Sequence, residues 1–314
     1  MLETHETLTG EPIGPEQQTG ITPREREFTV KERTQWQMAL RRFLRHRAAV
    51  VSLVVFVLLI LFAFVLPMFW KWKYTELVPV SDINQPPSLK HPMGTDSLHD
   101  TMAMVMRGTQ QSLKVTFIIA LVGTTTGAIW GVVAGFFGSV VDSTLMRLAD
   151  LVLTIPVFAL AAALAYNQGG TLVLIGLILA AVSAPYVSRV VRGVVLSLRE
   201  REFIEASRAL GASNLRIMLR HLLPNTIPVL IVNATLLIAT GILLETALSY
   251  VGVGIQAPDT SLGVLVSSNQ EAASTQPWLF YFPGLFIILI ALSVNFIGDG
   301  LRDALDPRQT RERR

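Results

Sequence analysis

The chain has 314 residues, of which 51% are hydrophobic and only 16% are charged, and its formal net charge is +3. A mean hydropathy of +0.49 is too high for an ordinary soluble domain, so the composition indicates a polytopic, all-α membrane protein. The absence of cysteine excludes disulfides, thiolate metal sites and cysteine nucleophiles.

Two segments precede the first apolar run. Residues 1–33 are rich in Glu, Thr, Gly and Pro without apolar periodicity, and we interpret them as a disordered cytoplasmic tail. Residues 34–47 predict an amphipathic helix at the membrane interface, because apolar and basic side chains fall on opposite sides. The apolar side holds Trp36, Leu40, Phe43 and Leu44, and the basic side holds Arg41, Arg42, Arg45 and Arg47.

Six apolar runs predict six transmembrane helices, the first of them an uncleaved anchor. The expected spans are 48–70, 113–137, 151–166, 171–187, 227–251 and 278–297. Arginines concentrate before the first run and again in 189–221, which places both segments in the cytoplasm. The N- and C-termini are therefore expected in the cytoplasm, residues 71–112 outside, 113–300 in the helical core and 301–314 in a cytoplasmic tail.

A polar, arginine-rich stretch at residues 198–224 separates the fourth and fifth runs. Read as a helix, it places Phe203, Ala206, Ala209 and Leu210 on one apolar face. Gly211 then interrupts the pattern as C-cap glycines do, and a second short helix is predicted from Asn214 to an end at Pro224. A rigid helix–glycine–helix element between spans suits docking of a cytoplasmic protein, whereas a plain solvated loop has the same basic composition.

Glycines recur at every fourth position of the second span, at Gly123, Gly127, Gly131 and Gly135. This spacing places them on one helix face, where another helix can approach closely. We predict a helix-packing role for this glycine strip, with general flexibility as the alternative.

Glu245 is a carboxylate within the fifth predicted span. A charge inside a membrane is costly, so this side chain is expected to face other helices or a water-filled cavity. Two interpretations stay open. One makes Glu245 a residue of a translocation pathway, in contact with substrate or a proton, and the other gives it a hydrogen-bonding structural partner near the outer end of the helix.

The sequence predicts no catalytic residue, no metal site and no cofactor bound by this chain. The P-loop pattern G-x-x-x-x-G-K-[ST], HExxH and GxSxG are all absent. His91, Asp96, His99 and Asp100 lie close together in sequence, but the turn-forming proline and glycine beside them explain that segment without a metal.

Four blocks, in order along the chain, resemble permeases of ABC importers of the dipeptide, oligopeptide and nickel class, and specifically the second permease of such systems. Residues 91–113 resemble HPLGTDxxGRDxxSRxxxGxRxSL, and residues 205–224 resemble the EAA motif. Residues 245–254 resemble E-x-x-LSFLGLG, and residues 298–308 match GDGLRDALDPR. The resemblance covers about residues 34 to 308.

The chain departs from these patterns at a few positions. Leu98-His99 stands where the first block has Gly-Arg. In the EAA motif, Ser207 replaces an alanine and His221 replaces an isoleucine.

The resemblance implies a type I ABC importer permease fold. It makes the segment at about 198–224 the coupling helix, which sits in a groove of a cytoplasmic ATPase. The residues implied to transmit this coupling are Glu205, Ala206, Ser207, Arg208, Ala209 and Gly211.

The resemblance also implies an assembly in the inner (plasma) membrane of a prokaryote. Its partners are a homologous second permease, two ATP-binding subunits or one fused pair that hold ATP and Mg, and an extracytoplasmic substrate-binding protein, with no nucleic acid. This chain is then a transport subunit, not an enzyme, and forms half of a pathway for di- or oligopeptides. Nickel or another small solute is the alternative substrate. An ion-coupled secondary transporter and a membrane receptor or scaffold are the rival classes.

Overall fold

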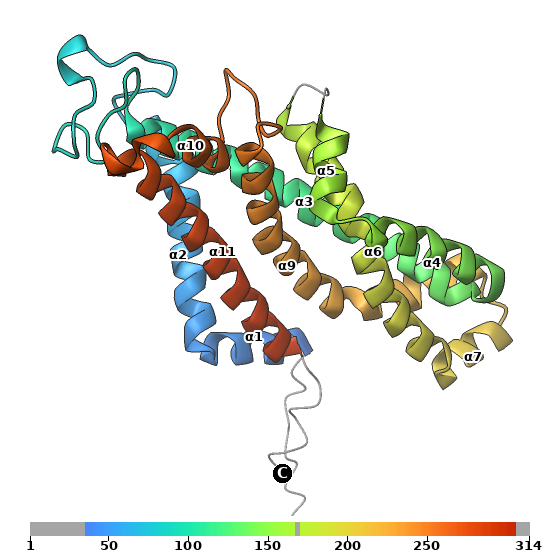
Figure 1. The fold of residues 1–314 in the computed structure, drawn as a ribbon. Helices are drawn as coiled ribbons and strands as arrows, with labels where there is room; N and C mark the ends of the chain where they lie inside the picture. Colours follow the sequence, from blue (N-terminus) through green and yellow to red (C-terminus); the bar gives the residue numbers. More distant parts are fainter. Residues whose placement is uncertain (1–34, 167–169, 306–314) are drawn as a thin grey trace, which may run out of the picture. The chain divides into compact units, whose positions relative to one another are not determined.

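The structure, a computed structural model, describes residues 35–166 and 170–305, which belong to the compact unit Gln35–Arg314. Within these ranges all regular secondary structure is helical, apart from an isolated β-bridge between Thr95 and Asp100 (Figure 1). We call the end of the helix bundle that carries the segment before Thr101 the outer end.

Five long helices dominate this unit. They are α2 (Arg47–Phe64), α3 (Thr101–Phe137), α6 (Leu172–Arg199), α9 (Leu223–Tyr250) and α11 (Pro277–Leu305). Each lies in a helical stretch long and apolar enough to cross a membrane. A sixth span results when α4 (Ser139–Thr154) and α5 (Val157–Ala165), which are bent by 85° at their junction, are counted as one. The all-α prediction is confirmed, and the number of six depends on this bent pair.

The predicted interfacial helix corresponds to α1 (Gln35–Arg45). Phe43 is buried against the end of α11, whereas Leu40 and Leu44 are exposed. The predicted apolar stripe is thus divided between a protein contact and an open face. Outside the described part of the chain lie the predicted tail 1–33 and the side chain of Trp36.

The helix that contains the second predicted span, 113–137, begins earlier, at Thr101 of α3. Asp100 caps this end, its Oδ1 accepting a hydrogen bond from Ala103 N at 2.8 Å. The first turns bury side chains such as Met106 against the segment that precedes the helix. Hydropathy reports where a helix meets lipid, and these polar first turns meet protein.

The third predicted span, 151–166, is not one straight helix. The chain leaves α4, turns at Pro156 and continues as α5. Proline has no amide hydrogen to donate and its ring obstructs the preceding turn, so the helix breaks there. Arg192 of α6 holds α4 in place through an ion pair with Asp142.

The predicted helix end at Pro224 is wrong. α8 (Asn214–Ile217), a π-helical turn η3 (Met218–Leu222) and α9 form one continuous helical stretch, Asn214–Tyr250. In an α-helix the proline ring clashes with the carbonyl four residues back. The wider π turn, whose hydrogen bonds span five residues, lets the helix pass through this position.

The last helix, α11, continues past the predicted span end at 297 and into the predicted tail 301–314. Its final turns pack on protein, since a Cβ on Gly300 would meet Phe43 and Ala49. Residues 306–314 lie outside the described ranges.

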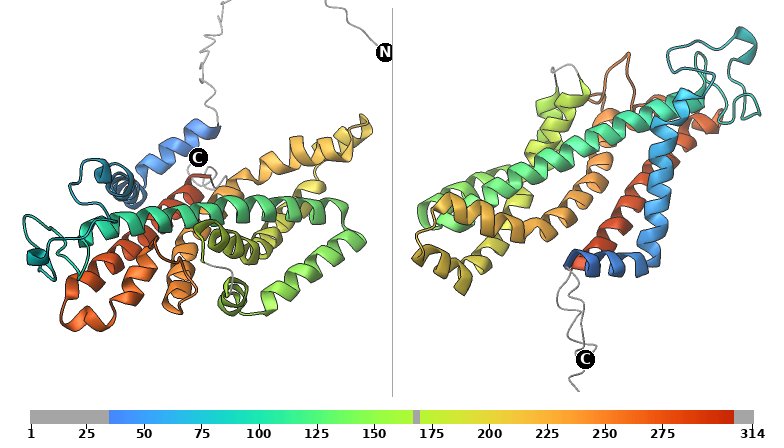
Figure 2. Two further views of the ribbon diagram at one scale, coloured as in Figure 1. Left: turned by 90° about the horizontal axis from the view of Figure 1, so that it is seen from above. Right: turned by 180° about the vertical axis from the view of Figure 1, so that it is seen from behind.

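Two apolar clusters form the core, and α3 and α9 contribute to both. One cluster lies among α3, α5, α6 and α9, and the other among α2, α3, α9, α10 (Leu262–Ser268) and α11. The most extensive helix contact is that of α3 along α6, which can be followed in both views of Figure 2. The core therefore joins the helices on either side of α3 and α9.

Asp100 organises the segment at the outer end. Its buried carboxylate accepts a hydrogen bond from Trp70 Nε1 at 3.1 Å and lies 2.7 Å from His91 Nδ1. Nearby, Lys90 hydrogen-bonds Asp82 and lowers the pKa of that carboxyl. Among the residues that the structure describes, no group of three or more His, Asp or Glu side chains is arranged to hold a metal ion.

Candidate functional site

The arginine-rich stretch forms a short helix, α7 (Glu202–Ala209), directly after α6 (Figure 1). One residue of this helix, Ile204, is fully buried in the cluster shared by α3, α6 and α9. The predicted coupling residues on α7 are Glu205, Ala206, Ser207, Arg208 and Ala209, and all except the half-buried Ser207 are exposed. The structure therefore brings these residues together on one exposed helix.

Gly211 sets the direction in which the chain leaves α7. Its N–H donates to Arg208 O at 2.9 Å, and the N–H of Ala212 donates to Ser207 O at 3.0 Å. These two bonds form a Schellman cap, which requires a left-handed residue, and the φ of Gly211 is +80°. A Cβ at this position would meet no atom within 4 Å, so the need for glycine is conformational and not steric.

The two departures from the EAA pattern, Ser207 of α7 and His221 of η3, lie opposite each other where these two elements meet. Ser207 Oγ lies 3.5 Å from His221 Nε2, and the ring of Phe203 lies 6.3 Å from the His221 ring. A hydroxyl and an imidazole thus face each other where the pattern has an alanine and an isoleucine. This polar contact joins α7 to the stretch that continues as α9.

A second set of contacts joins α7 to the C-terminal end of α3. The guanidinium of Arg208 lies 5.3 Å from the centre of the Phe136 ring. At the end of α6, Arg199 Nη1 donates to Gly135 O at 3.3 Å and to Phe136 O at 3.4 Å. A cation at the C-terminal carbonyls of a helix is favourable because of the helix dipole. Movement of α7 would therefore act on α3 directly.

The apolar face predicted for this element is exposed. Phe203 is 42% exposed and Leu210 is 88% exposed, and beyond Gly211 the apolar side chains of Leu215 and Leu219 are exposed as well. The sequence pattern placed Phe203, Ala206, Ala209 and Leu210 on this face but did not single out the buried Ile204. The exposure itself had a signal in the sequence, because Leu210, Leu215 and Leu219 lie in a polar, charged stretch, where apolar side chains need not be buried within the chain.

The four residues of the glycine strip lie along α6. A Cβ on Gly127 would approach Val187 Cβ to 2.6 Å, and one on Gly131 would come within 2.5 Å of Ser188 O and 2.8 Å of Val191 Cβ. Gly135 is similarly close to Val195 of α6, whereas a Cβ on Gly123 would first meet Leu237 Cδ1 of α9, at 3.2 Å, and then Ala180 O of α6, at 3.5 Å. The absence of side chains lets the backbones of α3 and α6 approach closely over this stretch.

Glu245 lies on α9 near the outer end and is fully buried. Its Oε2 accepts a hydrogen bond from Ser112 Oγ of α3 at 3.2 Å, and its Oε1 accepts one from Ser249 Oγ at 2.9 Å. Of the two open interpretations, this geometry matches a carboxylate held by structural partners.

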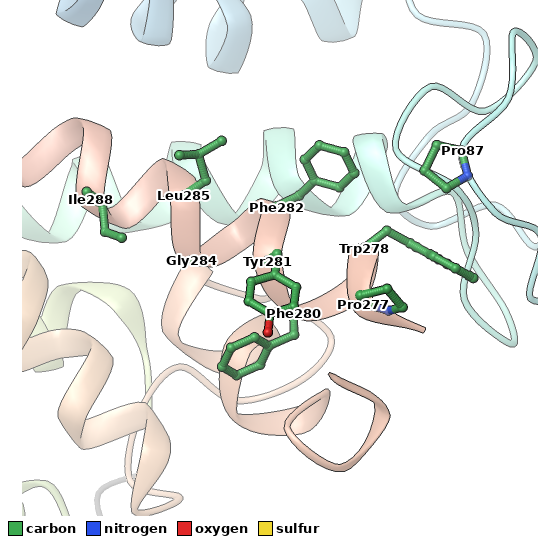
Figure 3. A pocket seen from close by; sticks show the side chains of 9 residues that line it. All are labelled: Pro87, Pro277, Trp278, Phe280, Tyr281, Phe282, Gly284, Leu285 and Ile288. Atoms are coloured by element: carbon green, nitrogen blue, oxygen red, sulfur yellow. The ribbon is translucent and has the colours of Figure 1, made fainter. Parts of the chain in front are cut away.

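An apolar groove of about 730 Å³ lies elsewhere, along the outer part of α11 (Figure 3). Trp278, Tyr281, Leu285 and Ile288 line it, together with Pro87 of the preceding outer segment. It contains none of the site residues predicted from the sequence.

Two family profiles match the chain. The family described as "Binding-protein-dependent transport system inner membrane component" matches residues 127–311. The family described as "N-terminal TM domain of oligopeptide transport permease C" matches residues 34–87.

Curated relatives match over most of the chain. The oligopeptide transport system permease protein OppC of Mycobacterium tuberculosis is 42% identical over 280 residues, which are 88% of this chain and 96% of that protein. OppC of Escherichia coli is 39% identical over 285 residues, 90% of this chain and 94% of that protein. The dipeptide transport system permease protein DppC of Alkalihalophilus pseudofirmus is 35% identical over 305 residues, 96% of each chain.

Solved structures show the same fold. A chain of the MetNI methionine ABC transporter, in inward-facing conformations, superposes with a TM-score of 0.54 at 22% identity, covering 65% of this chain and 97% of that chain. A second crystal form gives a TM-score of 0.53 at 21% identity. With a family profile over more than half of its length and relatives that match nearly all of it, the chain belongs to the family of binding-protein-dependent transport system inner membrane components, the permeases of ABC importers.

Proposed function

We propose that the chain forms half of the translocation pathway of an ATP-driven importer of di- or oligopeptides. Relatives whose names state oligopeptide or dipeptide transport match 88% to 96% of it. The importer lies in a prokaryotic inner membrane with both termini of this chain in the cytoplasm, an orientation supported by the arginines around α7.

In this proposal the chain works with four partners. A homologous second permease completes the pathway, two ATP-binding subunits (or one fused pair) hold ATP and Mg, and an extracytoplasmic binding protein delivers the peptide. The energy comes from the ATP-binding subunits, because this chain has no P-loop of its own.

The observation that carries the proposal is the exposed apolar face of α7. Exposed apolar residues beside charged ones are typical of a protein interface. Leu210 is 88% exposed to solvent, and the charged residues Glu205 and Arg208 of the same element are exposed too. We assign coupling to Glu205, Ala206, Ser207, Arg208, Ala209 and Gly211.

The contacts of α7 give this docking surface a route into the bundle. Arg208 touches the end of α3 through Phe136, and Ser207 touches η3 through His221. When the ATP-binding subunits close on ATP, they move α7, and α3 and α9 move with it. This movement switches the pathway between two states, and differential binding of ATP supplies the free-energy difference between them.

Purification of the tagged chain from its native membrane in mild detergent tests the proposal. We expect recovery of a second permease and of P-loop ATPases, with ATPase activity raised by the binding protein together with peptide. Nickel in place of peptide should give no stimulation.

A pair of matched variants tests the docking surface. Leu210→Asp should release the ATP-binding subunits, because it places a charge in an apolar contact. Leu89→Asp changes a leucine that is fully exposed at the outer end and should leave them bound. Recovery of the chain alone, with uptake that survives ATP depletion and collapses with a protonophore, would replace the proposal by an ion-coupled transporter.

A further inference from the structure

Glu245 lies where three segments of the outer end meet. Ser112 reaches it from α3, Ser249 from its own helix α9, and Ser261 belongs to the segment that leads into α10. We call these four residues the buried serine cluster. None is more than 5% exposed, so water does not provide alternative hydrogen-bonding partners.

With Glu245 in its carboxylate form, which only accepts hydrogen bonds, the bonds of the cluster have one direction. Leu262 N–H donates to Ser112 Oγ at 3.1 Å, so the single hydroxyl proton of Ser112 is available for Glu245 Oε2. Ser249 likewise donates to Glu245 Oε1. Because the hydroxyl proton of Ser249 is used in this way, Ser261 is the donor and Ser249 the acceptor in the 3.4 Å hydrogen bond between their hydroxyls.

Ser261 in turn accepts a hydrogen bond from Val264 N, which caps the start of α10. Two series of hydrogen bonds therefore begin at backbone N–H groups of α10 and end on the carboxylate of Glu245. One passes through Ser112, and the other passes through Ser261 and Ser249. A carboxylate offers an acceptor oxygen at each of the two positions that the serines reach, whereas an amide has an acceptor at only one of them and an apolar side chain has none.

The backbone around the cluster is closely packed. A Cβ on Gly263 would lie 2.6 Å from Thr246 Cα of α9, and one on Gly108 would lie 3.1 Å from Leu262 N. Further out, Arg107 of α3 forms a bidentate ion pair with Asp259, at 2.8 and 2.9 Å. Packing and polar contacts thus join α3, α9 and the start of α10 at one place.

We propose that Glu245 is a positioning residue that fixes the outer ends of α3, α9 and α10 to one another, so that they move as one unit. α9 belongs to a continuous helical stretch of 37 residues, Asn214–Tyr250, which is about 55 Å long. It runs from the coupling element to the buried serine cluster. This inference rests on the proposed function, because the movement it transmits is the one imposed on α7 by the ATP-binding subunits.

A positioning role and a pathway role predict different kinetics. Variants are assayed in the complete complex in proteoliposomes, with peptide uptake and ATP hydrolysis measured together. Glu245→Ala should lower the kcat of uptake by about tenfold with little change in KM, since a lost coupling contact weakens transmission and leaves peptide binding intact. Glu245→Gln should lie between Glu245→Ala and the unmodified chain, because the amide accepts from only one of the two serines.

The serine partners give a second measurement that does not depend on recovering Glu245→Ala. Ser112→Ala should reproduce the loss of coupling, because it removes the link between Leu262 N and Glu245. Thr240→Val is the matched control. Its hydroxyl bonds only within α9, to Leu236 O, on an exposed face, and the variant should couple as the unmodified chain does.

Thiol labelling separates the two roles independently of kinetics, because the chain has no cysteine of its own. In the positioning role, Glu245→Cys stays unreactive toward a hydrophilic thiol reagent throughout turnover. The inference would be overturned if Glu245→Cys were labelled during turnover and peptide prevented the labelling. It would also be overturned if the variants had a raised KM and Glu245→Gln lowered uptake as much as Glu245→Ala. Undiminished coupling in Ser112→Ala and Glu245→Ala would overturn it while the proposed function stands. Absence of ATP-dependent peptide uptake by the unmodified complex would instead reject the proposed function.

Discussion

Gly211 is the residue on which the proposed coupling element depends most directly. Its φ of +80° costs a residue with a Cβ about 1–2 kcal/mol. We expect Gly211→Val to leave the spans folded but to turn α8 away from α7, so that ATP is hydrolysed with less peptide imported. The ratio of peptide imported to ATP hydrolysed in proteoliposomes measures this effect.

Two variants show whether conformation is the cause. Gly211→Asn should retain most of the coupling, because asparagine tolerates the left-handed region better than valine. Gly193→Ala adds a Cβ in equally open surroundings but in the regular helix α6, and it should couple normally. An unchanged ratio in Gly211→Val would remove Gly211 from the coupling element.

Asp100 holds the outer segment to α3 through one carboxylate. Asp100→Ala removes a helix cap and leaves Trp70 and His91 without their acceptor, a loss of about 2–4 kcal/mol of unfolding free energy. The loss is measured as a lower Tm of the detergent-solubilised chain. Asp96→Ala, which changes a carboxylate that is 28% exposed in the same segment, should cost less. Equal losses in the two variants would show that Asp100 has no central role.

At the scale of elements, the glycine strip makes a prediction about the contact of α3 with α6. Gly131→Ala places a methyl group about 2.5 Å from Ser188 O, so the two helices must separate locally. We expect a loss of about 1–3 kcal/mol, the usual effect of overpacking, read as a lower Tm. Gly284→Ala is the control, since a Cβ there meets no atom within 4 Å. A Tm unchanged by Gly131→Ala would mean that the helices adjust without cost.

The spans could be predicted from the sequence, but several of their ends could not. Long apolar runs report the part of a helix that faces lipid, and each of the six runs falls mainly on helices of the structure, although the first passes the end of α2 at Phe64 and the third is divided between α4 and α5. α3 extends to Thr101 and α11 to Leu305 because their polar turns contact other parts of the chain, which hydropathy does not report. Pro156 breaks its helix while Pro224 does not, and the difference is the π turn η3, which has no simple sequence signal.

The candidate site was predictable to a similar extent. The position of α7 and its cap at Gly211 follow from local pattern, since a glycine after a helical run predicts a C-cap. The buried side of α7, at Ile204, depends on packing against distant helices. Likewise Ser112, the partner of Glu245, lies 133 residues away in the sequence, so the sequence alone does not predict that these two residues are in contact.

At the scale of the whole molecule, η3 sets the direction of the coupling element relative to α9. A π turn carries one more residue than an α-helical turn, so removing one residue leaves an α-helical turn, in which the ring of Pro224 clashes with the carbonyl four residues back and bends the helix. Deletion of Leu219, an exposed residue of η3, should therefore leave the fifth span in place but turn the docking surface away from its partner. The expected result is a chain that inserts in the membrane and recovers fewer ATP-binding subunits on purification.

Substitution at the same position provides the control for this deletion. Leu219→Ala removes the side chain but keeps the residue count and the π turn, so any loss it causes reflects contact area and not the direction of the helix. We expect Leu219→Ala to retain most of its ATP-binding subunits and the deletion to lose them. If both variants lose them equally, Leu219 acts only as a docking contact. A deletion that couples as well as the unmodified chain would show that α7 reaches its partner without a fixed direction relative to α9, and transmission would then run through Arg208 and α3.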